Sequence, residues 1–153
     1  ASPRLVLIVA GDGPDLPQLK AWADAHQLTD VEFLGYVRGE QKKQAILRSD
    51  IMLFPTSHGE GLPNAVLEAM LYGMPILSRI NAGIPDVVTH GENGFLTHST
   101  DPQSFADWLV QLATDQELRS QISHANHQKA IERFTSTKVR HRLVRIIEEI
   151  SGV

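Results

Sequence analysis

The stretch IMLFPTSHGEGLPNAVLEAM, residues 51–70, decides the fold. Its first four residues are apolar, and the loop that follows them contains Pro55, Gly59 and Gly61, a pattern typical of a short buried strand that ends in a turn. Pro63 then precedes a run of good helix formers, and proline suits the first position of a helix because its missing N–H has no partner there. The stretch therefore predicts a strand, a loop and a helix in succession.

The same alternation extends in both directions along the chain. Apolar or β-branched runs bounded by Gly, Pro, Asp or Asn predict strands at Leu5–Ala10, Val31–Leu34, Ile51–Phe54, Pro75–Ser78 and Phe95–Thr97. Helical spacing predicts helices at Leu16–His26, Gln41–Ser49, Pro63–Gly73 and Ile84–His90, with two or three more over Pro102–Gly152. This alternation indicates an α/β fold with a doubly wound parallel sheet, which binds ligands at the carboxyl ends of its strands.

The composition is that of an ordinary globular domain. The 153 residues carry a formal net charge of −4, are 42% hydrophobic and 21% charged, and include no cysteine. A negative net charge argues against nucleic acid as a partner, since nucleic-acid-binding proteins usually have a basic excess. The absence of cysteine excludes disulfides, thiolate metal sites and a Cys nucleophile. No stretch approaches the roughly 20 apolar residues of a membrane helix, and we expect a cytoplasmic location.

The predicted helix after Pro63 carries one polar stripe. Asn64, Glu68 and Tyr72 are spaced i, i+4, i+8, whereas the other positions are mostly apolar. A carboxylate on a buried helix must be paired or hydrogen-bonded. Side chains lean toward the helix N-terminus, so Glu68 is predicted to point toward the loop that holds Glu60. Free N–H groups at the helix start favour an anion, and carboxylates beside an anion site suit hydroxyl groups such as those of ribose and a sugar.

Glu60 and Glu68 are separated by seven residues, and the segment resembles the E-x7-E motif of retaining glycosyltransferases of family 4, which have the GT-B fold. Five other segments resemble that family in order and spacing: Leu7–Pro14, Val31–Val37, Gly73–Ser78, Ala82–Val88 and Gly91–Leu96. The resemblance covers about residues 5–115 well and the helical tail in general character. It implies the Rossmann-like C-terminal half of a GT-B glycosyltransferase, the half that binds the donor.

The resemblance implies a role for each residue of the motif. Glu60, the candidate catalytic residue, would contact hydroxyls of the transferred sugar, and Glu68 would hold the ribose hydroxyls of the nucleotide. The diphosphate would face backbone N–H groups at the helix N-terminus, those of Gly61, Leu62, Asn64 and Ala65. The turn at Tyr36, Val37 and Arg38 would lie near the base. The donor is expected to be a nucleotide diphosphate sugar, with a UDP-sugar favoured over a GDP-sugar, and no metal or cofactor is expected.

Two features depart from the family pattern. The pattern usually has Gly-Gly before x-Pro-Glu, whereas this chain has Ala82-Gly83-Ile84-Pro85-Asp86. Family members also carry an upstream strand and a basic Arg/Lys pair that neutralises the diphosphate. Nothing here matches that pair, and Arg79 is a candidate substitute. We expect residues 1–153 to form a single nucleotide-sugar-binding domain that lacks the acceptor-binding half and its own first strand, which would lie in the middle of the sheet.

The resemblance implies an activity for the intact protein and two further partners. The protein would transfer a sugar to an acceptor hydroxyl with retention of configuration, in the synthesis of cell-envelope polysaccharide or glycolipid. The partners are an N-terminal acceptor domain and a glycolipid acceptor at the inner face of the membrane, and this chain alone is expected to be inactive. Two alternatives stay open, a non-catalytic nucleotide-sugar-binding subunit that needs a partner and a sugar-nucleotide epimerase-like domain.

Overall fold

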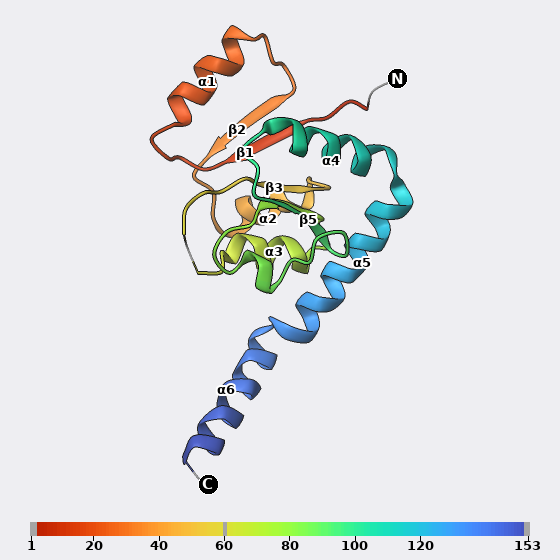
Figure 1. Ribbon diagram of the computed structural model, residues 1–153. Helices are drawn as coiled ribbons and strands as arrows, with labels where there is room; N and C mark the ends of the chain where they lie inside the picture. The colour runs from red at the N-terminus through yellow and green to blue at the C-terminus, as the bar shows by residue number, and fades with distance from the viewer. Residues whose placement is uncertain (1–2, 60, 152–153) are drawn as a thin grey trace. The chain divides into compact units, whose positions relative to one another are not determined.

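The computed structural model describes residues 3–59 and 61–151, and the chain divides into two compact units, Ala1–Asp50 and Ile51–Val153. The first unit contains β1 (Leu7–Ala10), α1 (Leu16–Ala25), β2 (Val31–Gly35) and α2 (Gly39–Leu47). The second contains β3 (Met52–Phe54), α3 (Asn64–Leu71), β4 (Ile76–Arg79), a 3-10 turn (Ile84–Asp86), β5 (Gly94–Thr97), α4 (Pro102–Thr114), α5 (Gln116–Arg133) and α6 (Ser136–Ser151) (Figure 1). Every strand pair among the described residues is parallel, which confirms the predicted α/β class.

The first unit is built on the parallel pair β1 and β2. Leu7 lies opposite Val31, and the N–H of Gly11, directly after β1, donates to the carbonyl of Gly35, the last residue of β2, at 2.8 Å. Gly35 has a φ of 65°, which favours glycine, and it turns the chain out of β2. These glycines therefore allow both strands to end at the same edge, where the chain turns toward α1 and α2.

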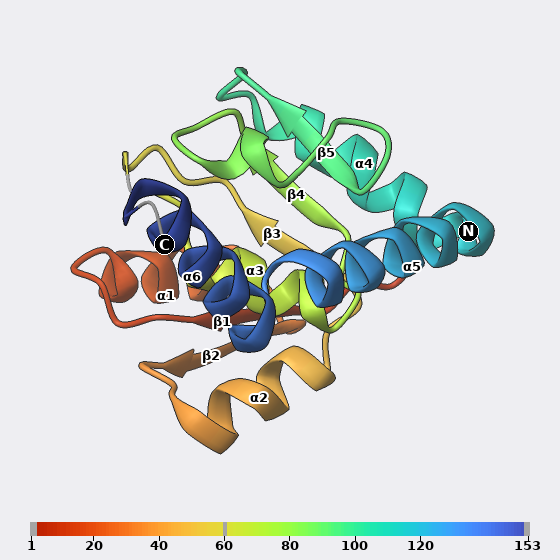
Figure 2. The ribbon, with the colours of Figure 1, turned by 90° about the horizontal axis from the view of Figure 1, so that it is seen from below.

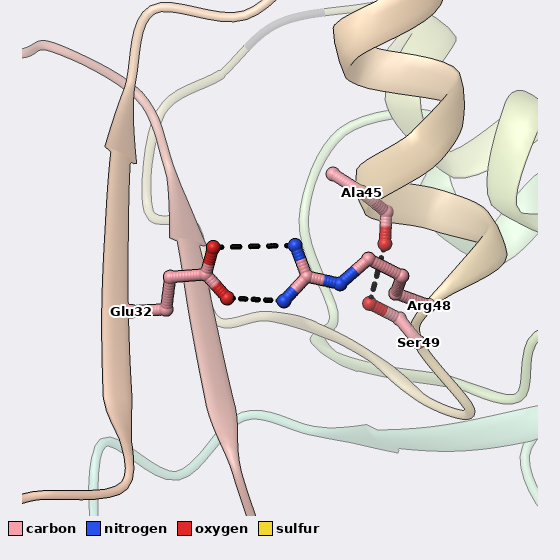
Figure 3. A network of polar contacts seen from close by, with 4 residues as sticks. All are labelled: Glu32, Ala45, Arg48 and Ser49. Carbon is pink, nitrogen blue, oxygen red and sulfur yellow. Dashed lines mark hydrogen bonds and ion pairs between the residues drawn. The ribbon is translucent and has the colours of Figure 1, made fainter.

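An ion pair ties the end of α2 to β2. Arg48, which follows α2, forms two hydrogen bonds with the carboxylate of Glu32, one of them 3.2 Å long between Nη1 and Oε1 (Figure 3). Next to it, the hydroxyl of Ser49 donates to the carbonyl of Ala45 at 2.8 Å. The hydrogen bond and the charge of Glu32 raise the pKa of Arg48. A planar guanidinium matches a carboxylate in this two-bond geometry, so the pair fixes the orientation of α2 as well as its position.

The second unit has a three-stranded sheet in which β4 lies between β3 and β5 (Figure 2). The register places Leu53 opposite Leu77 and Leu77 opposite Phe95, so these three side chains share one face of the sheet. They pack against α4 and α5 in a cluster that includes Phe105, Leu112 and Ile122. One cluster of the core of the second unit therefore lies on this face, while α3 packs close to β3 and β4.

A close contact joins the end of α3 to α5. Gly73 follows the helix with a φ of 76°, and a Cβ at this position would lie 2.6 Å from Oγ of Ser123. Asn126 of α5, which is fully buried, donates to the carbonyls of Met74 and Asn93 at 2.9 and 2.7 Å. Because a buried amide is stable only when it is hydrogen-bonded, α5 is fixed to the entry of β4 and to the loop before β5.

Three sequence-based predictions are corrected by the structure. The predicted helix Ile84–His90 is the 3-10 turn Ile84–Asp86, and the following residues are held by Asn93, whose side chain accepts from the N–H of Thr89 and donates to the carbonyl of Val87. Pro63 is the residue before α3 and not its first residue. The helix after Pro63 was predicted to be buried, yet α3 buries only Val66, Ala69 and Met70 among its residues and leaves Leu71 exposed.

The helices α4, α5 and α6 follow one another in the second unit, which settles the predicted two or three helices as three. The last of them, α6, buries none of its side chains. Its apolar residues have helical spacing and are exposed: Val139, Leu143, Ile146, Ile147 and Ile150. In the described part of the chain, no helix has the length and apolar character needed to cross a bilayer.

Candidate functional site

The candidate site begins where β3 ends. The chain leaves Phe54 and forms an open loop, in which the N–H of Thr56 donates to the carbonyl of Phe54 at 2.8 Å and the N–H of His58 donates to Oγ1 of Thr56 at 3.2 Å. Ser78 of β4 is fully buried, and its hydroxyl donates to the carbonyl of Phe54 at 2.6 Å. The base of the loop is therefore fixed to the sheet, and the loop projects from the carboxyl ends of β3 and β4.

The N-terminal end of α3 has backbone N–H groups with no hydrogen-bond partner among the described residues. Pro63 precedes the helix in an extended conformation, and its carbonyl accepts from the N–H groups of Val66 and Leu67 at 3.0 and 3.5 Å. Among the described residues, no side chain caps this helix. The first N–H groups of a helix have no partner within it, so those of Asn64 and Ala65 favour a negatively charged group at the helix start.

The polar stripe of α3 lies on its more open side. Asn64 is exposed, Glu68 is half-buried and Tyr72, which ends the helix, is 42% exposed. The opposite side of the helix carries the fully buried side chains of Val66 and Met70. The predicted spacing therefore places Asn64 and Glu68 on one face, with Glu68 one turn below the open donors at the helix start.

Two hydrogen bonds join the loop after β3 to the loop after β4. The side-chain amide of Asn81 donates to the carbonyl of His58 at 2.5 Å. The N–H of Gly83 donates to the carbonyl of Gly61 at 2.8 Å. A Cβ on Gly83 would lie 2.7 Å from that same carbonyl oxygen, so the approach of the two backbones requires glycine. The loops after β3 and β4 thus form one connected surface at this edge of the sheet.

The residues predicted from the sequence include Gly61 and Leu62 of this surface but not Asn81. Its bond to His58 joins residues 23 apart, and no local pattern marks a residue that reaches so far. The predicted site residues Gly61 and Leu62 lie in the loop, with Gly61 exposed and Leu62 half-buried, directly before Asn64 and Ala65. The candidate catalytic residue Glu60 lies outside the described residues.

The residues predicted to contact the base belong to the first unit. Val37 is half-buried, and the exposed Arg38 precedes α2 in an extended conformation with a φ of −150°. Both follow the carboxyl end of β2, which is where a parallel sheet presents ligand-binding residues. Their contact with the base stays a prediction.

Arg79, the candidate substitute for the basic pair, lies at the carboxyl end of β4. One guanidinium nitrogen, Nη2, is 3.5 Å from the carbonyl of His98, and the buried Nε has no hydrogen-bond partner among the described residues. Its role toward phosphate stays a prediction. Within residues 3–59 and 61–151, the side chains of His, Asp and Glu form no group of three that could hold a metal ion.

These features define an α/β unit with parallel strands whose carboxyl ends carry a loop, a helix start and a half-buried carboxylate, as in the Rossmann-like half of a GT-B protein. The family model for "Glycosyl transferases group 1" matches residues 1–129. The chain belongs to this family of glycosyltransferases.

Curated relatives support the assignment. The chain is 28% identical over 149 residues to "Putative colanic acid biosynthesis glycosyltransferase WcaL" of Salmonella typhimurium, an alignment that covers 93% of this chain and 37% of the relative. It is 32% identical over 134 residues to "N-acetyl-alpha-D-glucosaminyl L-malate synthase" of Bacillus anthracis, with 87% and 34% covered. The chain thus spans about a third of the length of these relatives.

Solved structures share the fold. Anabaena Alr3699/HepE, crystallised in complex with UDP-glucose, matches with a TM-score of 0.83 and 24% identity over 99% of this chain and 42% of that chain. The C-terminal domain of a group 1 glycosyl transferase, LpcC of Francisella tularensis, matches with a TM-score of 0.74 and 24% identity over 86% of this chain and 70% of that chain. The fold is therefore that of the C-terminal half of GT-B glycosyltransferases, as the sequence predicted.

Proposed function

We propose that this chain is the domain of a retaining glycosyltransferase that binds a nucleotide diphosphate sugar, with a UDP-sugar as donor. The observation that carries the proposal is the open N-terminal end of α3, which lies between the loop after β3 and the half-buried Glu68. The family membership of the chain and the UDP-glucose complex of Anabaena HepE support the choice of ligand.

The diphosphate is assigned to the start of α3. The N–H groups of Asn64 and Ala65, together with those of Gly61 and Leu62 in the preceding loop, are the donors in this proposal. Backbone donors at a helix start bind an anion without a side-chain charge, and the helix dipole adds to the attraction. Stabilisation of charge on the leaving diphosphate is the contribution that such a site makes to sugar transfer.

The hydroxyl groups of the donor are assigned to the two carboxylates. Glu68 lies on the same face of α3 as Asn64 and accepts hydrogen bonds from the ribose in this proposal. Glu60 contacts the transferred sugar and is the candidate catalytic residue. Val37 and Arg38 contact the base, for which uracil is favoured over guanine.

The activity of the whole protein is part of the proposal. The protein transfers the sugar to an acceptor hydroxyl held by an N-terminal domain, in the synthesis of cell-envelope polysaccharide. The name of the Salmonella relative gives colanic acid biosynthesis as the process of that protein. A glycolipid acceptor at the inner face of the membrane and a cytoplasmic location belong to the same proposal. Family membership favours this activity over that of an epimerase-like domain. A non-catalytic subunit would use the same donor site and would differ only in the absence of turnover.

The test is a calorimetric titration of the chain with UDP, GDP, ADP and their common sugar conjugates. The proposal predicts binding of one nucleotide and its loss in Glu68→Gln, because an amide accepts fewer hydrogen bonds from ribose and carries no charge. Glu149→Gln, at an exposed position of α6, is the matched control and should bind as the unsubstituted chain does. Equal binding by Glu68→Gln and the unsubstituted chain would refute the role of Glu68.

A further inference from the structure

The segment Asn81–Gly83 holds the loop after β3 at two points. The amide of Asn81 bonds to the carbonyl of His58, and the N–H of Gly83 bonds to the carbonyl of Gly61. The two acceptors are three residues apart, on either side of position 60 in the chain. One segment that follows β4 therefore holds the backbone of the loop at His58 and at Gly61.

We propose that Asn81 is a positioning residue for the sugar-binding part of the donor site. The inference rests on the proposed donor-binding function and adds a residue to it. Asn81 acts through the carbonyl of His58 and does not itself touch the donor. By holding the loop at His58, it fixes the part of the loop that the proposed function places beside the sugar.

The chemistry of the bond requires a hydrogen-bond donor at this position. The carbonyl of His58 is an acceptor, so its partner must be a donor, and asparagine supplies an N–H group on a short side chain. The substitution Asn81→Asp would keep the shape of the side chain and lose the donor, since an ionised carboxylate only accepts. Asn81 is half-buried and His58 is exposed, so the bond braces a loop at the surface and lies outside the core.

The location of the bond predicts which part of the donor depends on it. The diphosphate donors Asn64 and Ala65 belong to α3, whose position is set by its buried face and by α5. The loop at His58 is exposed and is hydrogen-bonded to the neighbouring loop through Asn81 and Gly83. Loss of the Asn81 bond should therefore weaken binding of the sugar and leave binding of the nucleotide nearly unchanged.

The experiment compares Asn81→Asp with Gln111→Glu in the full chain. Gln111 is exposed on α4, so the second variant makes the same change from amide to acid away from both loops. Affinities for UDP, UDP-glucose and UDP-N-acetylglucosamine are measured by calorimetry, and exchange of the backbone amides of residues 57–62 is followed by NMR. Thermal unfolding of each variant is the control that tests whether it remains folded.

The expected result is specific to the sugar. Asn81→Asp should lower the affinity for the better-bound UDP-sugar about three- to tenfold, as expected for one lost hydrogen bond, and should change the affinity for UDP less than about twofold. Amide exchange in residues 57–62 should rise, and Gln111→Glu should alter neither quantity. Unchanged UDP-sugar affinity would overturn the inference, as would an equal loss of UDP and UDP-sugar binding. If the unsubstituted chain binds none of the three ligands, the proposed function itself fails.

Discussion

The two units of the chain follow the same alternation of strand and helix, but they differ in what they bury. Among the described residues, the buried apolar side chains of the first unit are those of Ala23 and Ala45. The second unit buries large side chains on both sides of its sheet, among them Met70, Ile76 and Leu77. Parallel strands alone therefore do not make a core, and the two units should differ in stability.

The difference follows from the amount of apolar surface removed from water. In the first unit, large apolar side chains stay in contact with solvent, as for Trp22 with 56% and Leu47 with 54% of its surface exposed. Burial of one large apolar side chain contributes about 1.5–3 kcal/mol. The second unit buries several such side chains, and each adds to its stability. The loops after β3 and β4, which carry the candidate site, therefore project from the better packed of the two units.

The largest effect is expected for loss of a side chain from the core of the second unit. Leu77 is fully buried in contact with residues of α4 and α5, so Leu77→Ala should reduce the free energy of unfolding by about 3–5 kcal/mol. Leu19→Ala in the first unit removes a side chain that is 49% exposed and should cost about 0.5 kcal/mol or less. Urea unfolding measures both values. Similar losses in the two variants would contradict the contrast between the units.

An intermediate effect is expected for the buried amide of Asn126. Asn126→Leu keeps the size of the side chain but leaves the carbonyls of Met74 and Asn93, and the side-chain amide of Asn93, without this partner. An unsatisfied buried polar group costs about 1–3 kcal/mol, so the free energy of unfolding should fall by about that amount.

Thermal and urea unfolding of Asn126→Leu provide the measurement. Gln128→Leu, at an exposed position of the same helix, controls for the change from an amide to an apolar side chain. Equal stability of the two variants would mean that the hydrogen bonds of Asn126 do not hold α5 to the strands.

The smallest effect is expected for an exposed ion pair of the first unit. Arg4 bonds to Asp30 at 2.6 Å, and this hydrogen bond, together with the charge of Arg4, lowers the pKa of Asp30. Because the pKa is lower in the folded state, the stabilising contribution is present above the ordinary pKa of about 3.9 and is lost as the pH falls through the folded value. An NMR titration should find the pKa of Asp30 lower in the unsubstituted chain than in Arg4→Gln. Equal pKa values would show that the pair does not form in solution.

The sequence predicted the elements whose boundaries are marked by residues within or next to them. The strand–loop–helix stretch at residues 51–70 was placed within one or two residues, because apolar runs, Gly and Pro mark its boundaries locally. The helix predicted at Ile84–His90 was wrong, because the hydrogen bonds of the Asn93 side chain to this segment come from beyond it. The roles of Asn81 and of the buried Asn126 were not predicted for the same reason, because both side chains bond to backbone groups far away in the sequence.

We propose that the loop after β3 and the start of α3 bind the donor, and an amide-resolved NMR titration of the chain with UDP is the decisive measurement. We expect the largest chemical-shift changes on the backbone amides of Gly61, Leu62, Asn64 and Ala65, and smaller changes in Glu68→Gln at equal UDP concentration. Largest changes in α4, α5 or α6, with these four amides unaffected, would refute this location of the donor.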